Sequence, residues 1–201
     1  MTIFMYKNII FITNRKLVKK VSNNETEDFL QRIKYIASKK PYAIVLREKD
    51  LSEKEYFCLA AKVLEICKES NVLCVLHSFS KVAKELGCKS IHMPLEKLKK
   101  LSDEEKAYFT TIGASCHSVE DAILARNLGA NYITAGHVFA TDCKKGLAPR
   151  GLDFLGKVVK SVDIPVFGIG GINMEPEKLK QVLSTGAKGS CIMSYAMQEK
   201  L

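Results

Sequence analysis

Residues 124–136, LARNLGANYITAG, contain the junction between a predicted helix and the predicted strand that follows it. A helical segment ends near Leu128, Gly129 follows, and an apolar run begins shortly afterwards. Glycine readily takes the left-handed conformation that ends a helix, because it has no side chain to collide with the backbone. The same junction recurs as LGCKS at 86–90 and as TGAKG at 185–189. The repetition indicates a chain built from alternating helices and strands.

Short apolar runs recur along the chain and are separated by amphipathic segments, of which 52–70 is the clearest. Serines that precede an acidic residue by three positions mark predicted helix starts at Ser52, Ser102 and Ser118. The predicted strands are NIIFIT (8–13), YAIVL (42–46), NVLCVL (71–76), SIHM (90–93), FTTIGAS (109–115), NYITAG (131–136), PVFGIG (165–170) and GSCIM (189–193). Strands that alternate with helices pair in parallel and are covered by those helices.

This number of strands in 201 residues favours a small single-domain (β/α)8 barrel, a TIM barrel, within the α/β class. The alternative is a doubly wound open sheet, which usually has about five or six strands. The longest connection runs from 137 to 151, between the sixth and seventh strands. Long loops in compact α/β domains are usually functional, and in a barrel this loop lies at the end where the chemistry occurs.

The composition is that of a globular protein, with 47% hydrophobic and 26% charged residues. No uninterrupted apolar stretch approaches the roughly 18 residues that a membrane-spanning helix needs. The seven cysteines form no C-x-x-C pair and mostly lie in apolar runs, so we expect reduced, buried thiols in a cytoplasmic protein. The net charge of +9 suits a phosphorylated or carboxylated ligand, or a nucleic-acid backbone.

Two cations follow the second predicted strand. Strand alternation places Arg47 and Lys49 on one face and Glu48 on the other. Two positive charges on one face at a strand end could hold an anion. A solvated run of charges explains the same residues equally well.

The seventh and eighth strands end in residues typical of a phosphate site. Gly170 and Gly171 close the seventh strand, and Met193 and Ser194 follow the eighth. Backbone N–H groups at the two glycines, together with those at a short helix start near Ser194, would form a phosphate cradle. The run is no dinucleotide fingerprint, because the third glycine position holds Asn173. A tight strand-to-helix turn is the alternative interpretation.

His117 follows the fifth strand, directly before the Ser118 helix cap. Alternation groups it with Gly113 and Ser115, and small residues below a histidine suit a barrel interior. Imidazole titrates near pH ~6.5, so it can accept and return a proton. His137 at the start of the long loop is an equivalent candidate by position.

The long loop itself contains a Lys144-Lys145 pair, which could close over an anionic ligand or be a solvated turn. Cys116 and Cys143 lie beside these groups and are interpreted as structural or incidental.

Five segments resemble the superfamily of thiamine phosphate synthases and thiazole tautomerases of the TenI type. They are LREK (46–49), SCHSVEDA (115–122), GHVFATDCKKG (136–146), GIGGI (168–172) and MS (193–194). The resemblance covers the second to the eighth strand. The most specific part, GHVFATDCKKGLAPRG, resembles the tautomerase branch: synthases usually carry a proline where Ala140 stands and an aspartate where Gly146 stands.

Other departures from the synthase pattern concern magnesium. Val45 stands where synthases typically have glutamine, His77 and Ser78 replace an Asn-Asp pair, and Lys97 replaces a second aspartate. Without those acids the site lacks the oxygen ligands that Mg²⁺ prefers. The resemblance therefore implies a metal-independent, cofactor-free thiazole tautomerase, an isomerase of thiamine biosynthesis that moves a proton on a carboxylated thiazole phosphate.

The resemblance also implies roles for individual residues. His117 matches the catalytic histidine. The expected phosphate cradle is Gly170, Gly171, Met193 and Ser194. The expected ligand contacts of the long loop are Thr141, Cys143 and Lys144. The positions that match the pyrimidine-pyrophosphate pocket of the synthases are Ser115, Arg47 and Lys49.

Two alternatives stay open. One is thiamine phosphate synthase, which joins a thiazole phosphate and a pyrimidine pyrophosphate and would need Mg²⁺ on other acids, such as Asp50 or Asp142. The other is a non-catalytic regulator that binds a thiamine precursor or nucleic acid. Nucleic acid is not expected, because the lysines are spread as pairs without interleaved aromatic residues. The expected partners are a small phosphorylated thiazole and, by family resemblance, a second copy in a homodimer, without a membrane.

Overall fold

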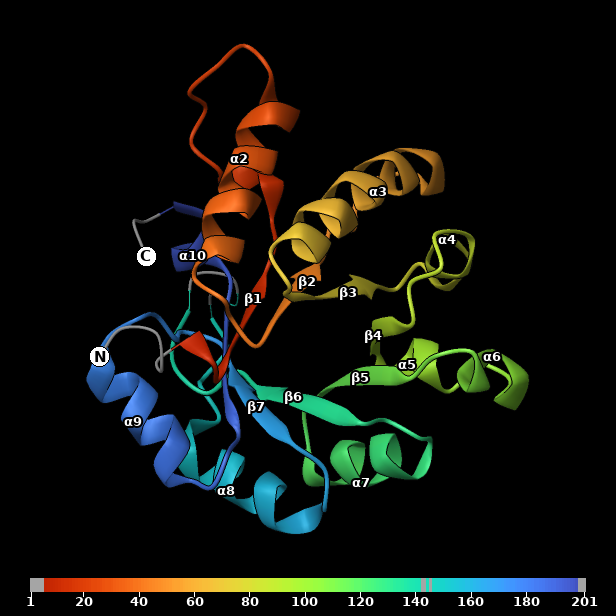
Figure 1. The fold of residues 1–201 in the computed structure, drawn as a ribbon. Helices are drawn as coiled ribbons and strands as arrows, with labels where there is room; N and C mark the ends of the chain where they lie inside the picture. Colours follow the sequence, from red (N-terminus) through yellow and green to blue (C-terminus); the bar gives the residue numbers. More distant parts are fainter. Residues whose placement is uncertain (1–5, 142–143, 145, 199–201) are drawn as a thin grey trace. The chain divides into compact units, whose positions relative to one another are not determined.

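The computed structural model describes residues 6–141, 144 and 146–198. Eight parallel strands pair in a closed barrel in the order β1 to β8. Helices separate successive strands along the chain (Figure 1). The strands are β1 (Ile9–Ile12), β2 (Ala43–Leu46), β3 (Leu73–His77), β4 (Ser90–Pro94), β5 (Thr111–Cys116), β6 (Tyr132–Gly136), β7 (Val166–Ile169) and β8 (Gly189–Ile192). The predicted (β/α)8 barrel is confirmed, and each predicted run contains most of one strand.

The helices begin and end close to the expected signals. They are α2 (Glu25–Ser38), α3 (Glu53–Glu69), α4 (Ser80–Glu85), α5 (Leu95–Leu98), α6 (Asp103–Ala107), α7 (Val119–Asn127), α8 (Gly151–Ser161), α9 (Pro176–Ser184) and α10 (Ser194–Gln198), with a 3-10 turn η1 at Arg15–Leu17. Ser52 and Ser102 form complete capping boxes with the glutamates three positions later. The Ser118 side chain accepts from the Asp121 backbone N–H at the start of α7.

The chain divides into two compact units, one formed by the residues up to Ser90 with those from Ile192 on, and one formed by Ile91–Cys191. In the first unit, β1, β2 and β3 pair in parallel, with Ile10 opposite Ala43 and Ala43 opposite Leu73. The helices α2 and α3 pack against each other, and α3 contacts both β2 and β3. This unit places the ends of β2 and β3 side by side.

In the second unit, β5, β6, β7 and β8 pair in parallel. The helices α7, α8 and α9 pack in sequence order along them (Figure 1). The register sets Ser115 opposite Thr134 and Gly136 opposite Ile169. The ends of β5, β6 and β7, which carry several predicted site residues, are thereby neighbours.

Most strand residues are buried, which explains why the predicted runs are continuously apolar and do not alternate. Cysteines at 67, 74, 88, 116 and 191 are buried free thiols, as expected, whereas Cys58 is exposed. No helix within the described ranges has the length and apolarity needed to cross a membrane.

The three glycine junctions have the conformation that the sequence predicts. Gly87, Gly129 and Gly186 have φ of +69°, +93° and +87°. A Cβ atom at Gly129 would meet nothing within 4 Å, so its requirement is conformational and not steric. Gly156 lies inside α8, also in open space, without a positive φ, and it therefore serves as a matched control.

Gly129→Ala is expected to lower the free energy of unfolding by about 1 to 2 kcal/mol, because alanine resists the left-handed conformation. Gly156→Ala is expected to raise it by about 0.5 to 1 kcal/mol, because alanine is the better helix former. Urea denaturation of both variants measures the difference. Equal effects of the two substitutions would contradict the assigned helix end.

Candidate active site

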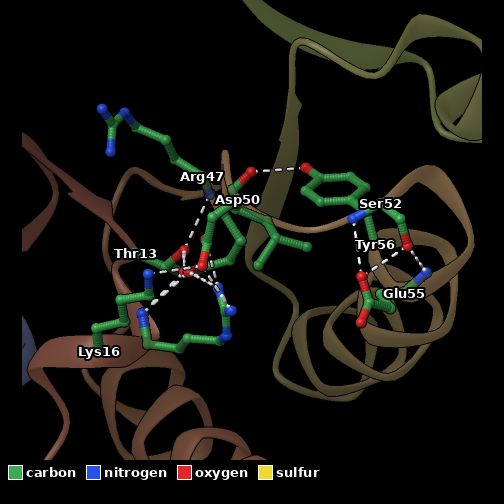
Figure 2. A network of polar contacts seen from close by, with 10 residues as sticks. Thr13, Lys16, Arg47, Asp50, Ser52, Glu55 and Tyr56 are labelled. Atoms are coloured by element: carbon green, nitrogen blue, oxygen red, sulfur yellow. Dashed lines mark hydrogen bonds and ion pairs between the residues drawn. The ribbon is translucent and has the colours of Figure 1, made fainter.

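Arg47 directly follows β2 and is half-buried. Its backbone N–H donates to Oγ1 of Thr13 over 2.9 Å. Its guanidinium extends away from the neighbouring polar network in Figure 2. Among the described residues, no acidic side chain pairs with this guanidinium. A half-buried cation without a carboxylate partner is suited to bind an anion.

Glu48 faces the opposite way, as strand alternation predicts, and is 3% exposed. Its carboxylate accepts from the Thr13 hydroxyl at 2.6 Å and from the Arg15 backbone N–H at 3.0 and 3.1 Å. The Arg15 guanidinium donates to the same carboxylate at 3.1 Å. This buried charge is therefore fully compensated by β1 and the turn that follows it, without drawing on Arg47.

Asp50 is also engaged by cations. The Arg15 guanidinium donates to both carboxylate oxygens at 2.7 and 2.8 Å, and the Lys16 ammonium lies 2.8 Å from one of them (Figure 2). Hydrogen bonds from Arg15 and then Lys16 hold the pKa of Asp50 well below its usual range. The two acids that follow Arg47 in sequence, Glu48 and Asp50, are thus both paired with other cations.

Tyr56 on α3 joins the ends of β2 and β3. Its hydroxyl donates to the Leu46 carbonyl at 2.6 Å and accepts from the His77 backbone N–H at 2.9 Å. The ring stacks on Phe79 with centroids 4.1 Å apart. Burial raises the pKa of Tyr56, so its phenol stays neutral. The Leu46–Arg47 peptide group is therefore held at both polar atoms. Tyr56 on α3 binds its carbonyl, and Thr13 after β1 binds its N–H.

His77 and Ser78 occupy the end of β3. The buried His77 ring places Nδ1 2.8 Å from Oγ of Ser78. Ser78 has φ of +71°, a left-handed conformation that a non-glycine residue adopts at a cost. Such conformations are concentrated at functional sites, where the surrounding structure enforces them.

The residues at the predicted magnesium positions do not fit that ion. Mg²⁺ prefers carboxylate oxygens, whereas His77, Ser78 and the exposed Lys97 offer an imidazole, a hydroxyl and an ammonium group. In the part of the chain that the structure describes, no three His, Cys, Asp or Glu side chains lie close enough together to hold a metal ion. Asp50, the alternative ligand, is already paired, and Asp142 lies outside the described residues.

His117 is exposed just after β5, in the second unit. Nδ1 lies 3.1 Å from the Gly136 carbonyl oxygen, which can only accept, so Nδ1 carries the hydrogen in this contact. The backbone N–H of His117 donates to Asp121 over 2.8 Å. The Nδ1 contact orients the ring, and the Asp121 contact fixes the backbone from which the ring extends.

Gly170 and Gly171 follow β7 with φ of +100° and +66°. A Cβ atom at Gly170 would lie 2.3 Å from Cβ of His137, and one at Gly171 would lie 2.3 Å from the Ala140 carbonyl oxygen. The backbone N–H groups of Val138 and Phe139 donate to the carbonyls of Ile169 and Gly170 at 2.9 and 3.0 Å. The structure therefore gives these glycines a packing reason: the loop after β6 lies directly on them.

The remaining predicted residues are placed as follows. Thr141 and Lys144 are partly exposed in one turn, where the Lys144 N–H donates to the Thr141 carbonyl at 3.0 Å. Cys143 and Lys145 lie outside the described residues. Met193 and Ser194 follow β8 and belong to the first unit, with Arg47 and Lys49, whereas Gly170, Gly171, Ser115 and His117 belong to the second.

Several polar residues around the site were missed by sequence reasoning. Thr13, Glu48 and Tyr56 hold the end of β2, and His92 contacts Ser115 with Nε2 2.9 Å from Oγ. Thr13 directly follows a strand, as Arg47 does, and this position could have indicated that it belongs to the site. His92 lies inside an apolar run, where a histidine is itself a signal.

Residues 9–196 match the TMP-TENI family model, which is described as thiamine monophosphate synthase. The chain belongs to this family. A thiamine-phosphate synthase from Fusobacterium nucleatum is 34% identical over 162 residues, which cover 78% of this chain and 76% of that protein. One from Pyrococcus abyssi is 34% identical over 155 residues, 77% of this chain and 74% of that protein. A thiamine phosphate pyrophosphorylase from Pyrococcus furiosus has a TM-score of 0.78 at 26% identity, covering 98% of this chain and 90% of that one.

These relatives confirm the superfamily but correct the predicted branch. The prediction of a thiazole tautomerase, and with it an isomerase, is wrong, because curated relatives at 34% identity over most of the chain are named thiamine-phosphate synthase, a transferase. The prediction gave too much weight to Ala140 and Gly146 in one loop and to the missing magnesium acids. Similarity spread over 162 residues outweighs these few positions.

The unsuited ligand set predicts weak magnesium binding by the protein alone. Calorimetric titration with MgCl₂ should show no saturable site with a Kd below about 1 mM, because the described residues contain no cluster of acidic side chains that could hold the ion. The Asp50→Asn variant should behave like the wild type. Saturable binding that Asp50→Asn removes would show that Asp50 exchanges its ion pairs for the metal, and saturable binding that persists would contradict the argument as well.

Proposed function

We propose that this protein is a thiamine-phosphate synthase, a transferase that joins a thiazole phosphate to a pyrimidine pyrophosphate. The observation that carries the proposal is the 34% identity over 162 residues to a relative of that name. The half-buried, uncompensated guanidinium of Arg47 at the end of β2 supports it, because one substrate is a pyrophosphate. The ends of barrel strands are where enzymes of this fold carry out their chemistry.

The joining reaction is a substitution at carbon. The neutral ring nitrogen of the thiazole attacks the methylene carbon that bears the pyrophosphate. A nitrogen–carbon bond forms, the carbon–oxygen bond breaks, and the electron pair leaves with the pyrophosphate. No proton leaves a substrate carbon, so this step requires no base. Its main demand is stabilisation of negative charge on the departing oxygen.

The chain's own cations meet that demand in this proposal. Arg47 and Lys49 bind the pyrophosphate, and by resemblance Ser115 is also a pyrophosphate-binding position. A guanidinium suits this role, because its planar donors match phosphate oxygens in pairs. In family members that use it, Mg²⁺ supplies the same charge neutralisation, and since the residues present here do not fit the ion, no step is assigned to it.

The other predicted residues keep binding roles. Gly170, Gly171, Met193 and Ser194 are assigned by resemblance to the thiazole phosphate. The loop residues Thr141, Cys143 and Lys144 are assigned to the bound ligand. His117 is proposed to accept a hydrogen bond through Nε2, since its Nδ1 is held by Gly136.

The test is the formation of thiamine phosphate from the two substrates, followed by chromatography in Mg²⁺ and in excess chelator. Product is expected from the wild type in both. Arg47→Met should lower kcat/KM by about 100-fold, the usual cost of losing one group that stabilises developing charge. The control Arg126→Met removes an exposed ion pair with Asp163 and should stay near wild-type activity.

Absence of product under both conditions would refute the proposed function. Product without any loss in Arg47→Met would retain the function but remove Arg47 from the pyrophosphate site.

A further inference from the structure

A buried histidine that the proposed reaction does not use lies in the second unit. His92 on β4 is 4% exposed, and both of its ring nitrogens have hydroxyl partners. Nε2 lies 2.9 Å from Oγ of Ser115 on β5, and Nδ1 lies 3.0 Å from the Tyr132 hydroxyl on β6. Tyr132 is 5% exposed, whereas Ser115 is partly exposed. A continuous chain of polar contacts therefore runs from the core to an accessible hydroxyl.

Space for this chain is created by a glycine. A Cβ atom at Gly113 would lie 2.2 Å from Cζ of Tyr132 and 2.4 Å from Nδ1 of His92. Both distances are much shorter than the contacts that real Cβ atoms make. Gly113 precedes Ser115 by two positions on β5, so it lies on the same face of the strand. The absence of a side chain at Gly113 thus leaves the space that the imidazole of His92 and the phenol of Tyr132 occupy.

The place of the Tyr132–His92–Ser115 contacts in the fold argues against a purely structural role. Burying polar groups in a core is costly unless each is hydrogen-bonded, and an apolar set of similar volume avoids that cost. Here the series of polar contacts ends at the Ser115 hydroxyl, near the carboxyl end of β5 and next to Cys116 and His117. That is the end of the strand at which a barrel enzyme contacts its substrate.

The chemistry of the three groups suggests one direction for the hydrogen bonds. A neutral imidazole donates through one nitrogen and accepts through the other. A phenol is a good donor, so the Tyr132 O–H is expected to donate to Nδ1. The hydrogen of His92 then lies on Nε2 and is donated to the Ser115 oxygen. This leaves the Ser115 O–H to donate outward.

We propose that His92 is a positioning residue that, held by Tyr132, turns the Ser115 hydroxyl into a donor toward a phosphate oxygen of the bound substrate. This inference rests on the proposed function, because it takes the pyrophosphate as the ligand of Ser115. It assigns to His92 and Tyr132 no contact with the substrate. Their effect is transmitted through Ser115.

The first test is independent of turnover. The protein contains four histidines, so ¹⁵N-histidine NMR with His92→Gln for assignment isolates the His92 signals. A neutral ring with hydrogen on Nε2 is expected, and inorganic pyrophosphate should shift the Nε2 resonance. Hydrogen fixed on Nδ1 would overturn the proposed direction, and an Nε2 signal unaffected by saturating pyrophosphate would overturn the ligand role.

The second test is kinetic. Tyr132→Phe should lower kcat/KM by about 5- to 10-fold, the effect of one neutral hydrogen bond, and should release His92 from a single tautomer. The control Tyr42→Phe removes an exposed hydroxyl and should change neither. Because His92 and Tyr132 act through Ser115, adding Tyr132→Phe to Ser115→Ala should cause no further loss of kcat/KM.

The kinetic outcomes discriminate between the claims. Full activity in Tyr132→Phe, or additive losses in the double variant, would overturn the positioning role while leaving the synthase assignment intact. Failure of the synthase assay with wild-type protein would refute the proposed function, and the tautomer and pyrophosphate measurements would still decide the inference about His92.

Discussion

The buried carboxylate of Glu48 is the constraint on which the polar arrangement at the end of β2 depends. Removing a carboxylate from water costs on the order of several kcal/mol unless hydrogen bonds and counter-charges replace the lost hydration. Thr13 and Arg15 supply both from the end of β1 and the turn that follows it. Strand alternation points the side chain of the preceding residue, Arg47, the other way, so the described partners of Glu48 do not include it. Within the part of the chain that the structure describes, no carboxylate pairs with this cation, which leaves it suited to a bound anion.

Tyr56 and Thr13 complete this arrangement by fixing the backbone on either side of the Leu46–Arg47 peptide. In the second unit, a comparable role falls to His92, which is held by Tyr132 and contacts Ser115. In both units a buried polar side chain determines how a partly exposed neighbour is presented. Such support is what positions a binding group accurately, since a long side chain or a hydroxyl rotor has many conformations otherwise.

The fold was predictable because its signals are local. Apolar runs bounded by capping serines and by glycines such as Gly129 define each helix-and-strand unit without reference to distant residues. Alternation along β2 likewise predicted that Arg47 and Glu48 face opposite ways. The partners of Glu48 could not be predicted in this way, because Thr13 and Arg15 lie more than thirty positions earlier and reach it only through the β1–β2 register.

The same limit explains the errors in the site and in the branch of the family. Contacts of His92 depend on how β4, β5 and β6 are aligned, which no short motif encodes. The tautomerase prediction depended on Ala140 and Gly146 in a loop, where substitutions are tolerated most readily. Identity distributed along the strands and helices of the barrel proved the better guide to the branch.

If the Glu48 anchor presents Arg47 to an anion, weakening that anchor must lower the affinity for inorganic pyrophosphate. Calorimetry should show binding to the wild type and to the exposed-site control Thr26→Val. Thr13→Val, which removes the hydroxyl that bonds both Glu48 and the Arg47 N–H, should bind about 5- to 10-fold more weakly while remaining folded. Equal affinity in Thr13→Val and the wild type would show that the Glu48 anchor does not position Arg47 for the anion.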